Sequence, residues 1–394
     1  MADVILKAGR EKSLLRRHPW IFSGAIQSED KNIAPGSTVN LISSDKQFLA
    51  QASYSPTSQI RARVWTFNGE VVDKEFLRKR IRTALDMRFA AYGSAYSNAK
   101  RLIYAESDGI PGLIVDQYDQ ILVLQSLTTG TEYWKEILAD LLLEETGLTT
   151  IYERSDADVR ELEGLQPKIG LLRGINPQMP ITINEFNLKF NINFAAGHKT
   201  GYYLDQRVNH LRVRELAKDK EVLDCFCYTG GFTVNALFGG AKSVLSVDSS
   251  ADALEFCKQN VALNDLDASR HSTLEGDVFQ LLRKFRDENR SFDMIILDPP
   301  KFAPTTAHAD KATRAYKDIN LLAFKLLRPR GVLVTFSCSG GIDSALFQKI
   351  VAGSALDAGV DAQIIRYLAQ ASDHPVSLHF PEGAYLKGLV CVKV

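Results

Sequence analysis

Acidic, glycine and cysteine residues follow short apolar runs at several points in the second half of the chain. The first of these runs ends in Asp224, and a turn with paired glycines, Gly230 and Gly231, precedes a helical run. Only glycine lets a backbone approach a ligand closely, so a strand, a glycine turn and a helix in this order are typical of the nucleotide-binding opening of an α/β sheet. We therefore expect Asp224 and the Tyr228–Gly231 backbone to hold the amino-acid portion of a cofactor.

Two further acids stand in comparable places. Asp248 ends the run 243–247 and is followed by Ser249, and Asp277 precedes Val278. The carboxylate of Asp248 suits a ribose diol. The carboxylate of Asp277 suits an adenine amino group beside an apolar slot. The phosphate-binding pattern GxxxxGK[ST] and the GxGxxG spacing are both absent, so we predict S-adenosylmethionine rather than a dinucleotide as the cofactor. The alternative, that the three acids only cap helices or turns, stays open.

The sequence Asp298-Pro299-Pro300-Lys301-Phe302 ends a fourth apolar run. Two prolines make the turn rigid, an aromatic side chain after them can stack on a planar base, and the acid can hydrogen-bond a ring nitrogen. Enzymes that methylate amino groups share such turns, so this motif does not choose the target atom.

Cys338, in the stretch Thr335–Gly340, does discriminate between target atoms. Carbon 5 of a pyrimidine is a poor nucleophile, and a thiolate that adds to carbon 6 activates it. The competing interpretation is a small buried apolar side chain, which is how we interpret the other four cysteines. Cys338 and Asp298 are thus the candidate catalytic residues.

These residues require a sheet that brings strand ends to one rim. Strands and helices alternate after a predicted β-hairpin at 181–194 and a polar loop at 197–207, which leads into a helix to about residue 216. This alternation predicts a parallel, doubly wound sheet in an α/β domain at 181–394. Its strands are expected at 222–226, 243–248, 271–275, 293–298 and 331–337, with a closing pair near 362–368 and 388–394.

The chain before this domain reads as two further parts. Residues 1–75 form short apolar runs between turns, which predicts a β-rich domain, and residues 76–180 predict a central α+β domain that ends in a connector at 164–180. Basic and aromatic residues alternate in the first part, including Arg16, Arg17 and, further on, Arg61, Arg63 and Trp65. Such a cluster suits RNA, and a solvated charged face is the alternative.

Composition limits the remaining choices. The length of 394 residues favours two or three domains. The 47 basic and 47 acidic residues give a formal net charge of zero, so an anionic partner must bind to a local basic patch. Five cysteines without a CxxC pair argue against a disulfide framework or a structural zinc site. An N-terminus without a signal-like apolar stretch and the lack of a long apolar run favour a cytoplasmic protein.

The chain resembles the bacterial ribosomal RNA large subunit methyltransferase I family over nearly its whole length. GREKSLLRRHPWIFSGAI and SYSPTSQIRARVWTF are similar to its N-terminal PUA domain, an RNA-binding pseudobarrel, and LIYAESDGIPGLIVDQY to its middle domain. HKTGYYLDQR, CFCYTGGF, SVDSS, DPPKF, KDIN, FSCSG and HFPEGAYLKG are similar to its methyltransferase domain. This resemblance implies a Rossmann-like sheet with S-adenosylmethionine contacts at Asp224, Asp248, Asp277 and the HKTGYYLDQR loop, and a nucleophile at Cys338.

The resulting prediction is a methyltransferase that acts on carbon 5 of a cytosine in 23S ribosomal RNA. The predicted cofactor-binding residues are Asp224, Tyr228, Gly230, Asp248, Ser249, Asp277, Val278, Lys199, Asp205 and Gln206. The predicted RNA-binding residues are Pro299, Pro300, Lys301, Phe302, Arg16 and Arg17. Larger cytosine-5 RNA methyltransferases carry a second cysteine beside the prolines, where Lys301 stands here, so the resemblance does not extend to a two-cysteine release scheme. A base N-methyltransferase, a non-catalytic RNA-binding factor and a homodimeric assembly stay open.

Overall fold

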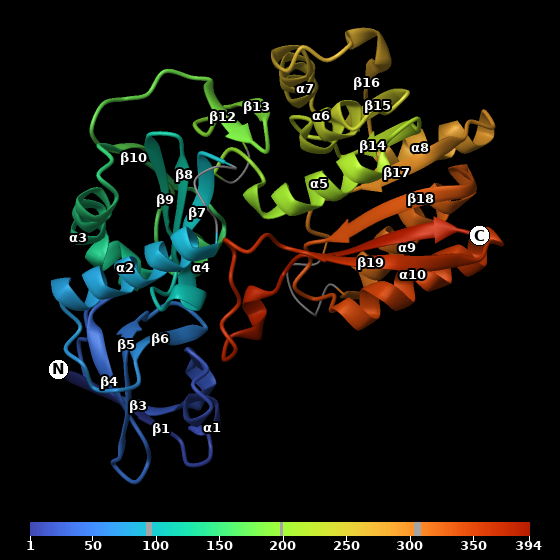
Figure 1. Cartoon of the computed structure of the whole chain (residues 1–394). Coiled ribbons are helices and arrows are strands. Elements are labelled where there is room, and N and C mark those ends of the chain that lie inside the picture. The colour runs from blue at the N-terminus through green and yellow to red at the C-terminus, as the bar shows by residue number, and fades with distance from the viewer. Residues whose placement is uncertain (92–96, 198–199, 303–308) are drawn as a thin grey trace. The chain divides into compact units, whose positions relative to one another are not determined.

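The computed structural model describes residues 1–91, 97–197, 200–302 and 309–394 (Figure 1). The chain divides into two compact units. The first contains Met1–Phe186, Ile192–Tyr202 and Ser372–Gly383, and the second contains Asn187–Asn191, Tyr203–Ala371 and Ala384–Val394. The division into three domains at residues 75 and 180 stays a prediction.

The first unit begins with a six-stranded sheet, as the short apolar runs predicted. Its strands have the order β2-β6-β5-β4-β1-β3. They are β1 (Ala2–Leu6), β2 (Trp20–Phe22), β3 (Ile26–Glu29), β4 (Thr38–Ile42), β5 (Phe48–Tyr54) and β6 (Ile60–Thr66), and a short helix α1 (Lys12–Leu15) precedes β2. Alternate apolar side chains of these strands, among them Val4, Val39 and Ala52, form a separate core.

A second, five-stranded sheet follows in the same unit. Its order is β11-β10-β9-β8-β7. The elements are α2 (Lys74–Ala91), β7 (Ala99–Tyr104), β8 (Leu113–Tyr118), β9 (Ile121–Ser126), α3 (Thr129–Thr146), β10 (Thr150–Ser155), α4 (Val159–Leu162) and β11 (Lys168–Arg173). A capping box at Thr128 starts α3, and Gly147 ends it in the left-handed conformation.

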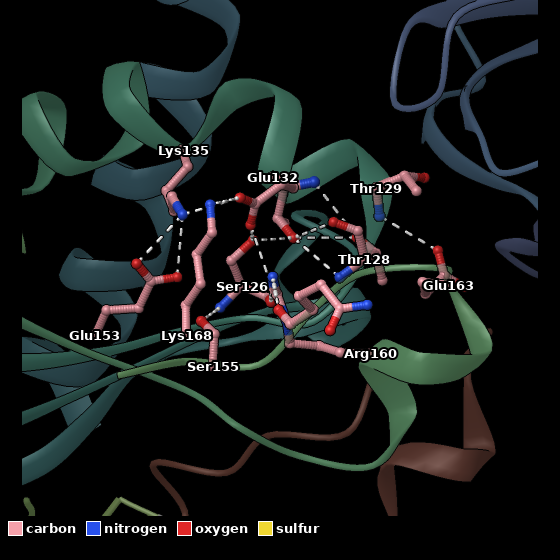
Figure 2. A network of polar contacts seen from close by, with 12 residues as sticks. Ser126, Thr128, Thr129, Glu132, Lys135, Glu153, Ser155, Arg160, Glu163 and Lys168 are labelled. Carbon is pink, nitrogen blue, oxygen red and sulfur yellow. Dashed lines mark hydrogen bonds and ion pairs between the residues drawn. The ribbon is translucent and has the colours of Figure 1, made fainter. Parts of the chain in front are cut away.

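The expected connector at 164–180 is wrong in part, because Lys168–Arg173 is the strand β11, paired antiparallel with β10. Figure 2 shows a polar network that ties this edge of the sheet to α3. Glu132 of α3 accepts hydrogen bonds from Lys168 (2.6 Å), Lys135 (3.0 Å) and Arg160 (3.1 Å). Burial acts to raise the pKa of Glu132, but these three cations outweigh it and lower the pKa to about 2.

The predicted hairpin is confirmed as the two-stranded sheet of β12 (Ile181–Glu185) and β13 (Leu188–Ile192). Phe186 and Asn187 form its turn, both with positive φ (46° and 66°), as the tightest hairpin turns require. In the second unit β13 is held by α7, since the Lys189 and Asn191 amides donate to the side chains of Asn264 and Asn260 at 2.7 Å.

The second unit is built on a seven-stranded sheet of order β16-β15-β14-β17-β18-β20-β19. The strands are β14 (Glu221–Cys225), β15 (Ser243–Asp248), β16 (His271–Glu275), β17 (Phe292–Leu297), β18 (Leu327–Ser337), β19 (Ala362–Ala369) and β20 (Lys387–Lys393). The helices are α5 (Arg207–Leu216), α6 (Gly231–Phe238), α7 (Ala251–Leu263), α8 (Val278–Asp287), α9 (Ala309–Leu326) and α10 (Ser344–Ala358).

Helices cover both faces of this sheet, as predicted. Neighbouring helices pack as α5–α6–α7 and as α8–α9–α10, and Figure 1 shows the two groups on opposite faces. The main core lies between the strands and α8, α9 and α10. Strands β14 to β18 are parallel, so their carboxyl ends meet at one rim.

The sheet departs from the predicted parallel arrangement at one strand, since β20 runs antiparallel to both β18 and β19. The helix α10 is the crossover that keeps β19 parallel to β18. The described segment between β19 and β20 contains just the short 3₁₀ helix η6 (Pro381–Gly383). The chain therefore returns in the opposite direction.

Candidate active site

The glycine loop between β14 and α6 is a tight turn with several residues in the left-handed conformation. Phe226, Tyr228 and Gly230 have φ values of 61°, 49° and 86°. A Cβ atom on Gly230 would lie 2.5 Å from the Cys257 sulfur atom, so both the conformation and the space require glycine here. The loop thereby presents backbone rather than side chain at the carboxyl end of β14.

Asp224, the last but one residue of β14, lies fully buried beneath this loop. Its Oδ2 accepts a hydrogen bond from Thr233 (2.6 Å), whose hydroxyl also lies 2.7 Å from Ser246 Oγ. Its Oδ1 is buried and has no hydrogen-bond partner among the residues that the structure describes. Burial raises the pKa of this carboxyl well above its usual range. Such an orphaned acceptor is satisfied when a donor group binds, so the residue fits a ligand that carries an N–H or an ammonium group.

Asp248, at the end of β15, joins the two neighbouring loops. Its Oδ2 accepts from the Tyr228 amide (2.9 Å) and its Oδ1 from the Ser250 amide (3.0 Å). Each carboxylate oxygen can accept a second hydrogen bond, so the half-buried group keeps capacity for a diol. The predicted neighbour Ser249 is exposed.

Asp277 takes the capping position that the alternative interpretation allowed. Its Oδ1 accepts from the Gln280 amide (2.9 Å) at the start of α8. The side chain is exposed and Val278 after it is buried. Capping engages one oxygen, so a contact of the other with a cofactor stays a prediction.

Asp205 and Gln206, in the 3₁₀ turn η3 (Leu204–Gln206), are buried and bonded inside the second unit. The Tyr385 hydroxyl donates to Asp205, and the Gln206 side chain accepts from Asn209 (2.6 Å). These contacts hold the loop before α5 in place. Lys199, the third predicted residue of this loop, lies outside the described residues.

Tyr203, in the HKTGYYLDQR loop but not among the individually predicted residues, lies near several of the candidate site residues. Its ring meets that of Tyr228 edge-on at 5.3 Å. Burial is the largest cause that raises the pKa of Tyr203, and the nearby Asp298, Tyr228, Asp205 and Cys338 raise it further. The two candidate catalytic residues thus lie in one neighbourhood with the glycine loop and the turn before α5.

Cys338 follows β18 and faces the turn after β17. Its sulfur atom lies 3.9 Å from the Pro299 carbonyl oxygen. The side chain is half-buried, whereas the thiols of Cys225, Cys227, Cys257 and Cys391 are buried. On the other side of Ser337–Ser339, the Tyr316 hydroxyl is 2.9 Å from Ser339 Oγ.

The residues after Asp298 differ in exposure. Pro299 is buried, and Pro300 and Lys301 are exposed. Phe302 is partly buried, with its ring centroid 4.9 Å from that of Tyr316 and 5.9 Å from that of Phe279. Its stacking on a base stays a prediction.

The basic cluster of the first unit is only partly at the surface. Arg16 and Arg17 are exposed, as RNA binding requires. Arg63 is buried and pairs with Glu163 at 2.7 Å, and Trp65 is buried in a core. These two residues therefore contribute to packing rather than to an RNA-binding surface, which corrects that part of the interpretation.

The residues that the structure describes contain neither a candidate metal site nor a candidate membrane-spanning helix. Histidine, cysteine and acidic side chains form no group there that could hold a metal ion. No described helix has the length and apolar character needed to cross a membrane.

The fold and the rim of the second unit define a methyltransferase that uses S-adenosylmethionine: residues 171–357 match the S-adenosylmethionine-dependent methyltransferase family, and residues 4–67 match a PUA-like domain. Relatives from Aeromonas salmonicida (50% identical) and Cronobacter sakazakii (48% identical), each aligned over 98% of both chains, are named ribosomal RNA large subunit methyltransferase I. The chain belongs to this family.

Solved structures support the fold of the whole chain. A protein from Streptococcus mutans, provisionally assigned as an S-adenosylmethionine-dependent methyltransferase, superposes with a TM-score of 0.87 at 21% identity over 100% of both chains. A second structure, of a provisionally assigned methyltransferase in complex with SAH, superposes with a TM-score of 0.88 at 21% identity over 100% of both chains.

Proposed function

We propose that this protein transfers a methyl group from S-adenosylmethionine to carbon 5 of a cytosine in 23S ribosomal RNA, through a covalent bond to Cys338. The relatives' names, which specify large-subunit ribosomal RNA, support the substrate class. The observation that carries the choice of atom is Cys338 itself. It is a half-buried thiol 3.9 Å from the Pro299 carbonyl, at the rim where Asp298 and the glycine loop also lie.

The proposed reaction begins when the Cys338 thiolate adds to carbon 6 of the cytosine. Ring nitrogen 3 takes up a proton from solvent as the thiolate adds and returns it when the thiolate leaves. The Asp298 carboxylate accepts a hydrogen bond from this N–H and stabilises the protonated nitrogen. S-adenosylmethionine, when bound, supplies an electrophilic methyl group that carbon 5 attacks. A base then removes the proton from carbon 5, the double bond between carbons 5 and 6 re-forms, and the Cys338 sulfur leaves as thiolate.

The other residues position the partners. Asp248 and the left-handed turn at Tyr228–Gly230 hold the cofactor beside the cysteine, and Asp224 offers its orphaned oxygen to a donor of the cofactor. Arg16 and Arg17 in the PUA-like domain bind RNA phosphates.

A Cys338→Ala variant tests this proposal. It is expected to lose methyl transfer while cofactor affinity, RNA affinity and the circular dichroism spectrum stay unchanged, because no hydrogen bond replaces the addition to carbon 6. The matched control is Cys391→Ala, which removes a buried thiol from β20 and is expected to stay active.

RNA with 5-fluorocytosine at the target position gives a second readout. The wild-type protein and Cys391→Ala should form an adduct that is visible as a mass increase, because fluorine does not leave as a proton does, and Cys338→Ala should form none. Methylation by Cys338→Ala would indicate N-methylation through the Asp298 turn instead. Failure of the wild type to bind S-adenosylmethionine in calorimetry would favour the non-catalytic RNA-binding factor.

A further inference from the structure

Lys387 stands at the start of β20 and reaches the segment that carries Cys338. It lies opposite Ser337 in the antiparallel ladder of β18 and β20. Its Nζ donates a hydrogen bond of 2.8 Å to the carbonyl oxygen of Ser339. Because Ser337 and Ser339 flank Cys338, the half-buried Lys387 side chain spans the position of the cysteine.

The hydrogen bond to Ser339 brings the Lys387 ammonium group into the electrostatic environment of Cys338. Burial lowers the pKa of Lys387 to about 8, the Cys338 thiolate acts to raise it, and Lys301 and Asp343 lower and raise it respectively. Charge interactions are reciprocal, so an ammonium group that is favoured by the thiolate also favours the thiolate.

One acidic group, Asp298, lies in the same neighbourhood as Cys338 and opposes a second negative charge there. Asp298 and Cys338 both act to raise the pKa of Tyr203 and of Tyr316, which places a carboxylate in the same neighbourhood as the thiol. A carboxylate disfavours a second negative charge, and phenols with raised pKa values stay neutral. A thiolate is the reactive form of cysteine, so this neighbourhood requires a cation.

We infer that Lys387 is a positioning residue for the proposed reaction: its ammonium group holds the Ser337–Ser339 segment through the Ser339 carbonyl and stabilises the Cys338 thiolate. The thiol proton passes to solvent, Lys387 keeps its own proton, and no bond to Lys387 forms or breaks. This inference rests on the proposed role of Cys338 as a nucleophile.

The same strand offers a matched lysine. Lys393, at the other end of β20, donates to the carbonyl oxygens of Phe324 (3.1 Å) and Leu327 (2.7 Å). Burial also lowers its pKa. Lys393 therefore matches Lys387 in three respects: it belongs to β20, it is partly buried, and it donates hydrogen bonds to backbone carbonyl oxygens. It differs from Lys387 because the carbonyl oxygens that it contacts lie outside the segment that carries Cys338.

The test is the pH dependence of Cys338 alkylation by iodoacetamide in the full-length protein, read from the mass of the labelled peptide. Lys387→Gln keeps a donor for the Ser339 carbonyl and removes the charge. Its alkylation rate at pH 7 is expected to fall about tenfold, with the midpoint of the profile moved to higher pH by about one unit. Lys387→Arg should restore most of the rate, and Lys393→Gln should match the wild type.

Coincident profiles for Lys387→Gln and the wild type, or an equal shift in Lys393→Gln, would overturn the inference. The 5-fluorocytosine adduct separates this result from the proposed function. If Cys338→Ala still methylates RNA, the proposed function fails whatever the alkylation profiles show. If Cys338→Ala is inactive and the profiles coincide, only the role of Lys387 fails.

Discussion

Single side chains at the rim can join neighbouring loops, and Asp248, which we propose to bind the ribose of the cofactor, is the example with the most direct consequence. Its two oxygens each accept an amide, one from the glycine loop and one from the start of α7. Removal of the carboxylate therefore releases both loops in addition to losing the proposed acceptor for the ribose.

Asp248→Ala is expected to weaken S-adenosylmethionine binding by roughly 2 kcal/mol, about 30-fold in Kd, because a charged acceptor is lost. Asp248→Asn should show a smaller loss. The exposed Asp252 in the first turn of α7 provides the control, since Asp252→Ala leaves both loops tied. Isothermal titration measures all three variants, and an unchanged Kd in Asp248→Ala would remove this residue from the site.

The positions of the residues at the rim could be predicted from the sequence, but the side chains that pair with predicted residues from distant parts of the chain could not. A strand, a glycine turn and a helix around Asp224 follow from local rules, and the structure has them at the expected positions. Arg63 and Trp65 were misassigned because Glu163, which pairs with Arg63, lies 100 residues further along the chain. Lys387 was not recognised as a site residue, since a lysine before an apolar run is typical of any strand that begins at the surface.

At the scale of elements, strand positions were predictable and strand directions were not always so. The apolar run in β20 has the same pattern in either direction, and only the connection from β19 makes it antiparallel. The strand β11 was missed because its exposed, glycine-containing sequence owes its conformation to pairing with β10. Long-range pairing, which local periodicity does not encode, accounts for both differences.

The pairing of β20 leads to a prediction about Gly388. This residue lies opposite Phe336, and a Cβ atom on it would come within 2.6 Å of the buried Phe336 ring. Gly388→Ala is expected to destabilise the second unit by roughly 1–3 kcal/mol, because the ring stacks on Phe232 at 5.4 Å and has no room to move.

Gly353 in α10 is the matched control, because its nearest neighbour would be Lys317 at 3.9 Å. Gly353→Ala should stabilise the same unit by roughly 0.5–1 kcal/mol through its helix propensity. Urea unfolding monitored by hydrogen exchange in β18 and β20 compares the two. Equal midpoints for both variants would contradict the close approach at Gly388.

At the scale of the whole molecule, RNA binding and cofactor binding are expected to be separable. Replacement of the exposed Arg16 and Arg17 by Ala should weaken RNA binding and reduce the slope of log K against log salt by about 1.5, because phosphate contacts release counterions. The Kd for S-adenosylmethionine should stay unchanged, since the described residues that we propose to bind it belong to the second unit.

A charge-matched control is available in the first unit. Lys31→Ala combined with Lys79→Ala also removes two exposed cations and should leave the salt slope as in the wild type. RNA titrations at several salt concentrations give both quantities. If the Arg16 and Arg17 variant binds RNA like the wild type, this part of the cluster is a solvated face.

The division of the chain into units has a consequence for its synthesis. Residues 372–383 belong to the first unit, and residues 384–394, which contain β20, belong to the second. A ribosome delivers these segments after the rest of both units, so during translation the first unit lacks part of its contacts until residue 383 has emerged, and the second until β20 has emerged. Fragments cut at any single point will also lack part of at least one unit, and the methyltransferase unit can be isolated only by joining pieces that are separate in the gene.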